Sequence, residues 1–220
     1  MKTYTTIAGA ALAVLVLGLP AVAQAACPRV ADAAISVQVV DPGPRVTSTK
    51  SLDQINVMAG SHGLLRDGFK VLGITTIKLD NGIKVKYQGQ PVGGAVCVSV
   101  NRVEVTFGLK DHHVSVPREY PQGSCHYNVV MRHEMAHVDV NRRTVRKYAD
   151  ILKNDMRAAL RRSGAVAAST MVQGQNVQTA VIQKVLDDIT VRFNAELEKL
   201  HGAIDQPGGK YAAAGRCPGW

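Results

Sequence analysis

The residues best suited to chemistry lie in one stretch, VVMRHEMAHVDVNRR, at positions 129–143. It contains His133, Glu134 and His137 at the spacing H-E-x-x-H. On a helix, residues four apart lie on one face, so both imidazoles can reach one metal ion at about 2 Å, the usual zinc–nitrogen distance. Glu134 is rotated by about 100° from His133 and can act on a water molecule without binding the metal. The spacing predicts His133 and His137 as zinc ligands and Glu134 as a general base.

The alternative is a chance match on an ordinary surface helix. A random chain of this length matches H-E-x-x-H on the order of once in a hundred. Here the match lies near the start of a helical pattern that follows several strand-like segments, and the chain has only 7 histidines. We therefore interpret the stretch as a metal site.

Two histidines do not hold zinc alone, so a third ligand is needed. One class of zinc enzymes has a glycine three residues after the second histidine and a third histidine six residues after it. This sequence has Val140 and Arg143 at those positions. Another class uses a glutamate about twenty residues further on, where Asp155 is the nearest acidic residue. A continuous helix would place Asp155 some 27 Å from His137, so it is excluded.

A second helix offers better candidates. Two helices joined by a connection at 164–176 are expected to pack antiparallel, which brings His133 and His137 opposite positions near 207 and 203. His201 is our first choice for the third ligand, and it is followed by the small residue Gly202. The alternatives are Asp205, then Glu198 and Glu196. Taken alone, His201 also fits a helix-end histidine stabilised by the helix dipole.

The wider pattern predicts one α+β domain. Alternating and β-branched residues favour strands in the first half, with a hairpin turn at Asn81-Gly82. A short helix with Ser51 as its cap is expected within 47–60. The second half carries two helical runs, 126–162 and 182–204. We expect a mainly antiparallel β-sheet in the β-rich part, 26–120, followed by a long antiparallel helical hairpin, 126–205, and a tail, 206–220.

The first 25 residues have the features of a secretory signal peptide. Lys2 precedes an apolar run at 7–19, and Ala23-Gln24-Ala25 forms a cleavage site. The run is shorter than the roughly 20 residues that span a bilayer. The sequence thus predicts a mature domain at 26–220, secreted or periplasmic, without a transmembrane segment.

The four cysteines are Cys27, Cys97, Cys125 and Cys217. An even count in an exported chain predicts disulfides. Of the three possible pairings we favour Cys97–Cys125 with Cys27–Cys217, which would clamp a strand to the motif helix and join the two ends of the mature chain. Metal binding by cysteine is disfavoured because none are spaced as C-x-x-C.

The net charge of +9 suggests attraction to anionic surfaces, including an anionic envelope polymer. Many basic residues have spacings typical of a solvated helix face, as do Arg142, Arg143, Arg146 and Lys147. Since aromatic residues do not alternate with them, nucleic-acid binding is not expected.

Two further segments precede the motif. We expect the tandem pair His112-His113 to lie on the surface. The strand at 113–117 is a candidate exposed edge that could pair with an extended peptide.

The chain resembles a family of predicted secreted bacterial zinc-dependent proteases, known as a domain of unknown function. The resemblance rests on the export signal with a strand-rich first half, on SCHYNVVMRHEMAHVDV, and on FNAELEKLHGAID. It implies a zincin-like metallopeptidase that acts on peptide or protein substrates, with His133, His137 and His201 as zinc ligands and Glu134 as the base. Two other functions stay open, a non-catalytic metal-binding envelope protein and an amidase acting on peptidoglycan.

Overall fold

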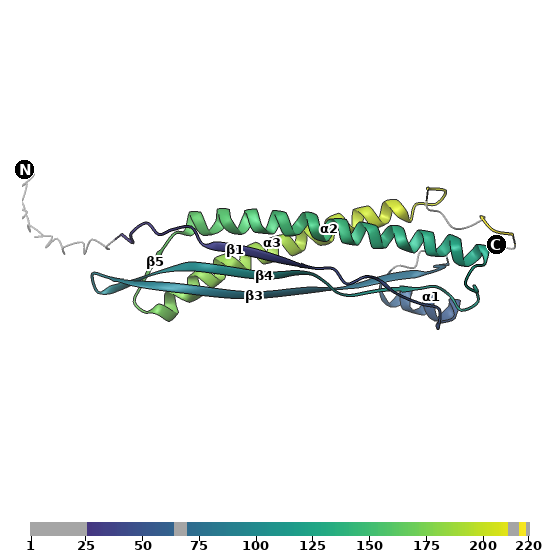
Figure 1. The fold of residues 1–220 in the computed structure, drawn as a ribbon, viewed down its shortest axis with the longest axis horizontal. Coiled ribbons are helices and arrows are strands. Elements are labelled where there is room, and N and C mark those ends of the chain that lie inside the picture. Colours follow the sequence, from purple (N-terminus) through teal and green to yellow (C-terminus); the bar gives the residue numbers. More distant parts are fainter. Residues whose placement is uncertain (1–25, 64–69, 211–215, 219–220) are drawn as a thin grey trace, which may run out of the picture.

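A computed structural model describes residues 26–63, 70–210 and 216–218. The predicted signal peptide, 1–25, lies outside the described residues. The fold is elongated, with a long twisted sheet on one side and two long helices packed along it on the other (Figure 1). No described helix is both long enough and apolar enough to cross a bilayer.

Strand β4 (Ala95–Ser115) forms the centre of the sheet. Along one edge it pairs antiparallel with β3 (Ile74–Val92), over almost its whole length. The predicted hairpin turn at Asn81-Gly82 is wrong, because both residues lie within β3 and pair with β4. Along the other edge it pairs in succession with β5 (Val166–Ala168), β1 (Ala34–Val40) and β2 (Arg45–Thr47). The β5 pairing is antiparallel, whereas β1 and β2 run parallel to β4.

The predicted fold class is therefore wrong. The sheet is not a mainly antiparallel N-terminal unit followed by a helical hairpin, because β1 and β2 are parallel to β4 and β5 joins it from between the two long helices. Residue alternation reveals which face of a strand is buried but not the direction of its neighbour. The parallel pairings depend on a long crossover through α1 (Leu52–Ser61) and β3, which no local pattern reveals.

Each helix begins at a hydroxyl cap. Ser51 caps α1 as expected, and its hydroxyl accepts a hydrogen bond from the Gln54 N–H. Ser124 caps α2 (Cys125–Ser163), which ends before Gly164, a residue with φ of 58°. Thr170 caps α3 (Met171–Ile204), so α3 begins inside the segment predicted as a connection. A capping hydroxyl offsets the unpaired N–H groups of the first turn, and this fixes where each helix starts.

The core lies between the sheet and the two long helices. One face of β4 presents Val103, Val105, Phe107 and Leu109, all at most 2% exposed. Phe107 meets Phe193 of α3 edge to face, with ring centroids 5.7 Å apart. A smaller apolar cluster, with Val114 and Val130, joins the end of β4 to the first turns of α2. This second cluster fixes the part of α2 that carries the two histidines.

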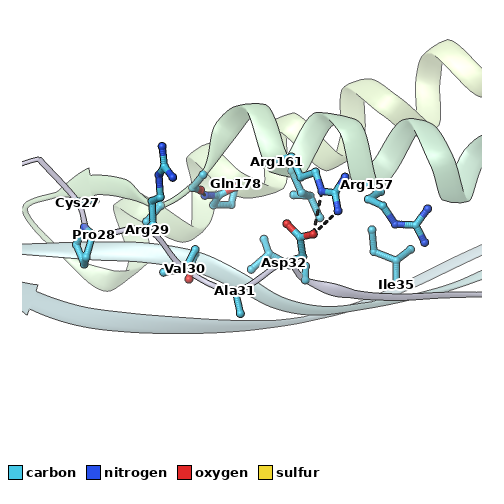
Figure 2. Close-up of a pocket in the computed structure, with 16 residues that line it drawn as sticks. Cys27, Pro28, Arg29, Val30, Ala31, Asp32, Ile35, Arg157, Arg161 and Gln178 are labelled. Atoms are coloured by element: carbon cyan, nitrogen blue, oxygen red, sulfur yellow. Dashed lines mark hydrogen bonds and ion pairs between the residues drawn. The ribbon is translucent and has the colours of Figure 1, made fainter.

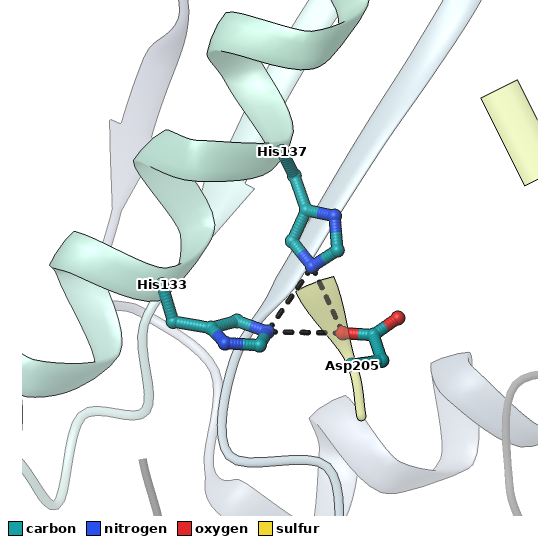
Figure 3. A group of neighbouring side chains, drawn as sticks. All are labelled: His133, His137 and Asp205. Atoms are coloured by element: carbon teal, nitrogen blue, oxygen red, sulfur yellow. Dashed lines mark hydrogen bonds and ion pairs between the residues drawn. The ribbon is translucent and has the colours of Figure 1, made fainter. Parts of the chain in front are cut away.

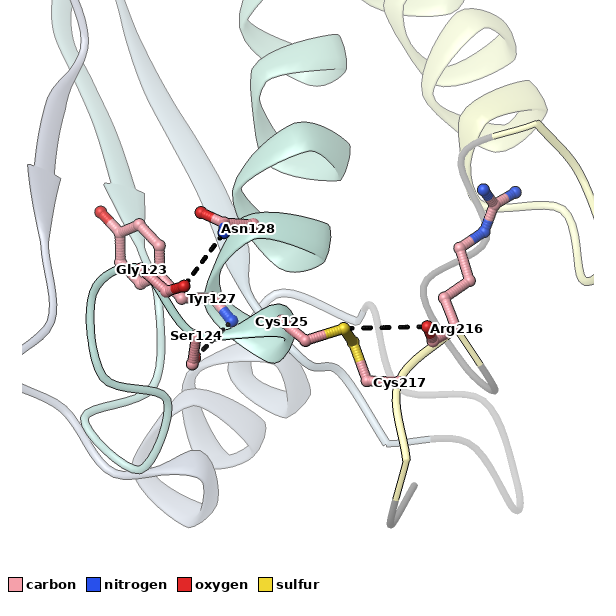
Figure 4. The surroundings of a disulfide bond; sticks show 7 residues. All are labelled: Gly123, Ser124, Cys125, Tyr127, Asn128, Arg216 and Cys217. Carbon is pink, nitrogen blue, oxygen red and sulfur yellow. Dashed lines mark hydrogen bonds between the residues drawn. A yellow bond between two sulfur atoms is a disulfide. The ribbon is translucent and has the colours of Figure 1, made fainter.

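All four cysteines form disulfides, but the predicted pairing is wrong. The bonds are Cys27–Cys97 and Cys125–Cys217, and the second ties the start of α2 to the C-terminal segment (Figure 4). Cys97 lies near the start of β4, whereas Cys125 follows its far end. A strand rises about 3.3 Å per residue, so the length of β4 keeps these two cysteines tens of ångströms apart.

Candidate metal centre

Three donor atoms converge where the beginning of α2 meets the end of α3 (Figure 3). His133 and His137 project from successive turns of α2, and Asp205 is the residue that ends α3. The Nε2 atoms of the two histidines are 3.1 Å apart, and each lies 3.1 Å from Oδ1 of Asp205. This group could hold a metal ion.

Hydrogen bonding alone does not satisfy this triangle. Each Nε2 holds at most one proton, and an ionised carboxylate only accepts hydrogen bonds. If both rings donate to Asp205, their two N–H groups face each other. If one ring donates to the other, only one proton remains for Asp205. Two of the three contacts at most are therefore hydrogen bonds, whereas a cation would be bound by all three atoms.

The donor set fits zinc. Three atoms 3.1 Å apart leave room for an ion about 2 Å from each, the distance typical of zinc with histidine nitrogen and carboxylate oxygen. Zinc sites that catalyse reactions have three protein ligands and one open position. The Asp205 side chain is 45% exposed, so the group lies at the surface, where an ion and a water molecule can reach it.

The charge of Asp205 is also stabilised. Burial by itself would raise the pKa of Asp205, but the hydrogen bonds from His133 and His137 outweigh it. The pKa of this carboxyl is therefore held below its usual range. Asp205 is ionised at neutral pH, as a metal ligand must be.

Asp205, not His201, takes the third position. Nδ1 of His201 lies 2.7 Å from Nδ1 of His137, the ring nitrogen turned away from the group. Burial lowers the pKa of His201 to about 4, so this ring is neutral at physiological pH. Neither Glu196 nor Glu198 is among the three donors, and Glu196 pairs with Lys147 further along α2.

The difference between His201 and Asp205 is one turn of α3. Residues four apart share a helix face, so both point toward α2. The positions expected opposite His133 and His137, near 207 and 203, bracket Asp205. The prediction of His201 followed from its residue type, because imidazole is a common zinc ligand, and not from the helical register.

Glu134 lies beside the group but is not part of it. Its side chain is buried, and Oε2 accepts a 2.7 Å hydrogen bond from the Thr75 hydroxyl of β3. Burial raises the pKa of Glu134, although the nearby His137 and His133 partly offset this. Gly73 leaves room for the carboxylate, because a Cβ there would lie only 2.8 Å from Oε1.

A buried polar chain extends behind the group. Nε2 of His201 lies 2.9 Å from Oδ1 of Asn141, and Nδ2 of Asn141 lies 3.3 Å from Nε2 of His112. His112 is only 2% exposed, so the predicted surface location is wrong for this histidine. Sequence reasoning missed Asn141, although it follows His133 and His137 at the same four-residue spacing.

The predicted exposed strand edge also has a different location. Residues 113–115 lie inside the sheet, between β2 and β3. Among the described residues, no strand pairs with the outer edge of β3. This edge strand begins at Ile74, next to the residue that binds Glu134.

A cavity of about 360 Å³ lies at the other end of α2, away from the three donors (Figure 2). Its lining includes Asp32, which pairs with Arg161, and the buried Ser99. The cavity is therefore separate from the metal centre.

Comparisons with known protein families, curated proteins and solved structures find no match for this chain.

Proposed function

We propose that the protein is a zinc-dependent peptidase that acts outside the cytoplasm. The observation that carries the proposal is the set of three donor atoms, 3.1 Å apart, with a buried glutamate beside it. A structural zinc site usually has four protein ligands, whereas this group offers three and lies at the surface.

Each residue has a task in this proposal. His133, His137 and Asp205 hold the zinc ion, which acts as a Lewis acid when it is bound. Glu134 accepts a proton from the attacking water and returns it to the leaving nitrogen, so peptide cleavage balances without another proton donor. Its raised pKa suits this exchange, because a base is most effective when its pKa approaches the working pH. Thr75 holds the carboxylate in place.

The outer edge of β3 favours a peptide as the substrate. An extended peptide can add to an exposed edge through backbone hydrogen bonds, which do not depend on its sequence. This edge begins beside Thr75, and therefore beside the base. An unfolded segment of protein fits such a surface better than a compact small molecule.

The compartment is proposed from two features. Two disulfides are typical of proteins that fold under oxidising conditions. The predicted signal peptide at 1–25 provides the route of export. Together they favour secretion or a periplasmic location.

Replacement of the base tests this function. The protein and its Glu134→Gln variant are loaded with zinc, and cleavage of unfolded casein is compared. We expect the variant to keep its zinc and to cleave at least about 100-fold more slowly, because general-base catalysis contributes that much. Equal cleavage by both proteins, or no cleavage by the wild type, would contradict a peptidase. Purified peptidoglycan as a second substrate detects an amidase.

A further inference from the structure

His137 uses both of its ring nitrogens. Nε2 faces His133 and Asp205, whereas Nδ1 lies 2.7 Å from Nδ1 of His201. A neutral imidazole carries one proton, so its Nε2 can bind a metal ion only when the proton is on Nδ1. Whether His137 is a ligand therefore depends on the location of one proton.

The Asn141 side chain decides that location. Its oxygen lies 2.9 Å from Nε2 of His201, and an amide oxygen only accepts hydrogen bonds. A single proton on the His201 ring therefore lies on Nε2, which leaves Nδ1 as an acceptor. The short contact between the two Nδ1 atoms then requires His137 to donate. Nε2 of His137 can then bind a metal ion in place of a proton without loss of this hydrogen bond.

The reverse arrangement shows why the amide matters. If the nitrogen of Asn141 faced His201, that ring would accept at Nε2 and donate from Nδ1. His137 would then hold its proton on Nε2, directed at the other two donors. Asn141 lies between His201 and His112 and is 1% exposed, so the protein encloses this amide completely.

We propose that Asn141 and His201 are positioning residues that keep the proton of His137 on Nδ1 and leave Nε2 available to a metal ion. The inference deepens the proposed function and rests on the same metal site. Histidine ligands commonly donate their second N–H to an acceptor, and loss of the acceptor weakens metal binding about 10- to 100-fold. Here the acceptor is another histidine, which accepts only because Asn141 takes its own proton.

The proton positions can be observed in the metal-free wild-type protein. Nitrogen-15 NMR of the histidine rings distinguishes protonated from unprotonated nitrogens. We expect His137 to be protonated on Nδ1 and His201 on Nε2. A His137 ring that carries no proton on Nδ1 would overturn the inference. Because no metal takes part, this result is independent of the proposed function.

The second test measures the zinc affinity of the full chain by competition with a chelator. His201→Leu removes the acceptor and should bind zinc about 10- to 100-fold more weakly. His201→Gln supplies an amide oxygen instead and should restore most of the affinity. Asn141→Leu should weaken binding, whereas Asn141→Asp, which still accepts from His201, should not.

A matched control is available at His62, an exposed histidine at the end of α1. His62→Leu and His62→Gln should leave the zinc affinity unchanged, and thermal unfolding of each metal-free variant checks its fold. If folded His201→Leu binds zinc as tightly as the wild type, the inference is wrong although the metal site stands. A wild-type protein that binds no zinc contradicts the proposed function, and the NMR result then decides the inference alone.

Discussion

At the scale of single residues, Glu134 is enclosed on two sides. Thr75 donates to Oε2, and Gly73 lies against Oε1 with no side chain between them. A buried carboxylate with few donors is costly, so its exact position depends on these two neighbours. The base is thus placed by β3 as well as by the helix that carries it.

A methyl group at Gly73 should displace the base. In Gly73→Ala the new Cβ would lie 2.6 Å from a Val130 methyl and 2.8 Å from Oε1 of Glu134. We expect peptide cleavage to fall by at least tenfold while zinc binding persists, because the three donors lie elsewhere. Gly82→Ala is the control, since a Cβ there meets Thr106 at an ordinary 3.5 Å. Equal cleavage rates in the two variants would show that Glu134 is not constrained in this way.

Residue spacing predicted only what one helix determines. His133, Glu134 and His137 lie within five residues, so their relation follows from the helix alone. The third donor depends on the contact between α2 and α3, where one turn exchanges His201 for Asp205. Thr75 and Gly73 come from a strand about sixty residues away and leave no local signal.

At the scale of elements, α3 lies close against the sheet at Gly174. A Cβ at this position would lie 2.4 Å from a methyl group of Val98 on β4. A glycine inside a helix costs about 1 kcal/mol relative to alanine, yet here it permits the packing. This explains why α3 can begin at Met171 despite the glycine in its first turns.

Two glycines of α3 should therefore respond in opposite ways to the same change. Gly174→Ala should lower the free energy of unfolding by about 1–3 kcal/mol, because the methyl group overpacks the contact with Val98. In Gly202→Ala no other atom lies within 4 Å of the new Cβ. This variant should therefore raise the free energy of unfolding by up to about 1 kcal/mol. Urea denaturation measures both. A stabilised Gly174→Ala variant would mean that α3 does not pack as closely as described.

Glu196 links the two long helices in a pH-dependent way. It accepts hydrogen bonds from Lys147 and Tyr148 of α2, and the Lys147 bond lowers its pKa. A carboxyl with a lowered pKa in the folded state stabilises the fold above its ordinary pKa, and this contribution is lost as the pH falls through the folded value.

Glu196→Gln should therefore destabilise the protein slightly at pH 7, and its difference from the wild type should shrink as the pH falls below the ordinary glutamate pKa. The effect should be smaller than that of Gly174→Ala, because the Lys147 side chain is half exposed and screened by solvent. Denaturation curves at several pH values test this. If the difference in free energy of unfolding between the two proteins grows as the pH falls, the pKa of Glu196 is not lowered in the folded state.

At the scale of the whole molecule, the chain builds one long sheet with the two long helices packed along one of its faces (Figure 1). Three segments from different parts of the sequence share one edge of β4. The sequence predicted strand-forming segments, the Ser51 cap and the apolar faces of the two long helices, since each leaves a local pattern. Pairing directions and disulfide partners were predicted wrongly because both depend on which distant segments meet along β4.

The metal centre also depends on this global arrangement. It lies where α2 begins and α3 ends, and the Cys125–Cys217 bond ties the C-terminal segment to the same start of α2 (Figure 4). The centre therefore joins segments that are about seventy residues apart in sequence. A bound ion should hold the ends of both helices together.

The most direct test of the metal centre is an anomalous difference map from crystals of the zinc-loaded protein, recorded at the zinc absorption edge. We expect one strong peak about 2 Å from Nε2 of His133, Nε2 of His137 and a carboxylate oxygen of Asp205. No peak between these atoms, or a peak bound by His201 in place of Asp205, would contradict the centre described here.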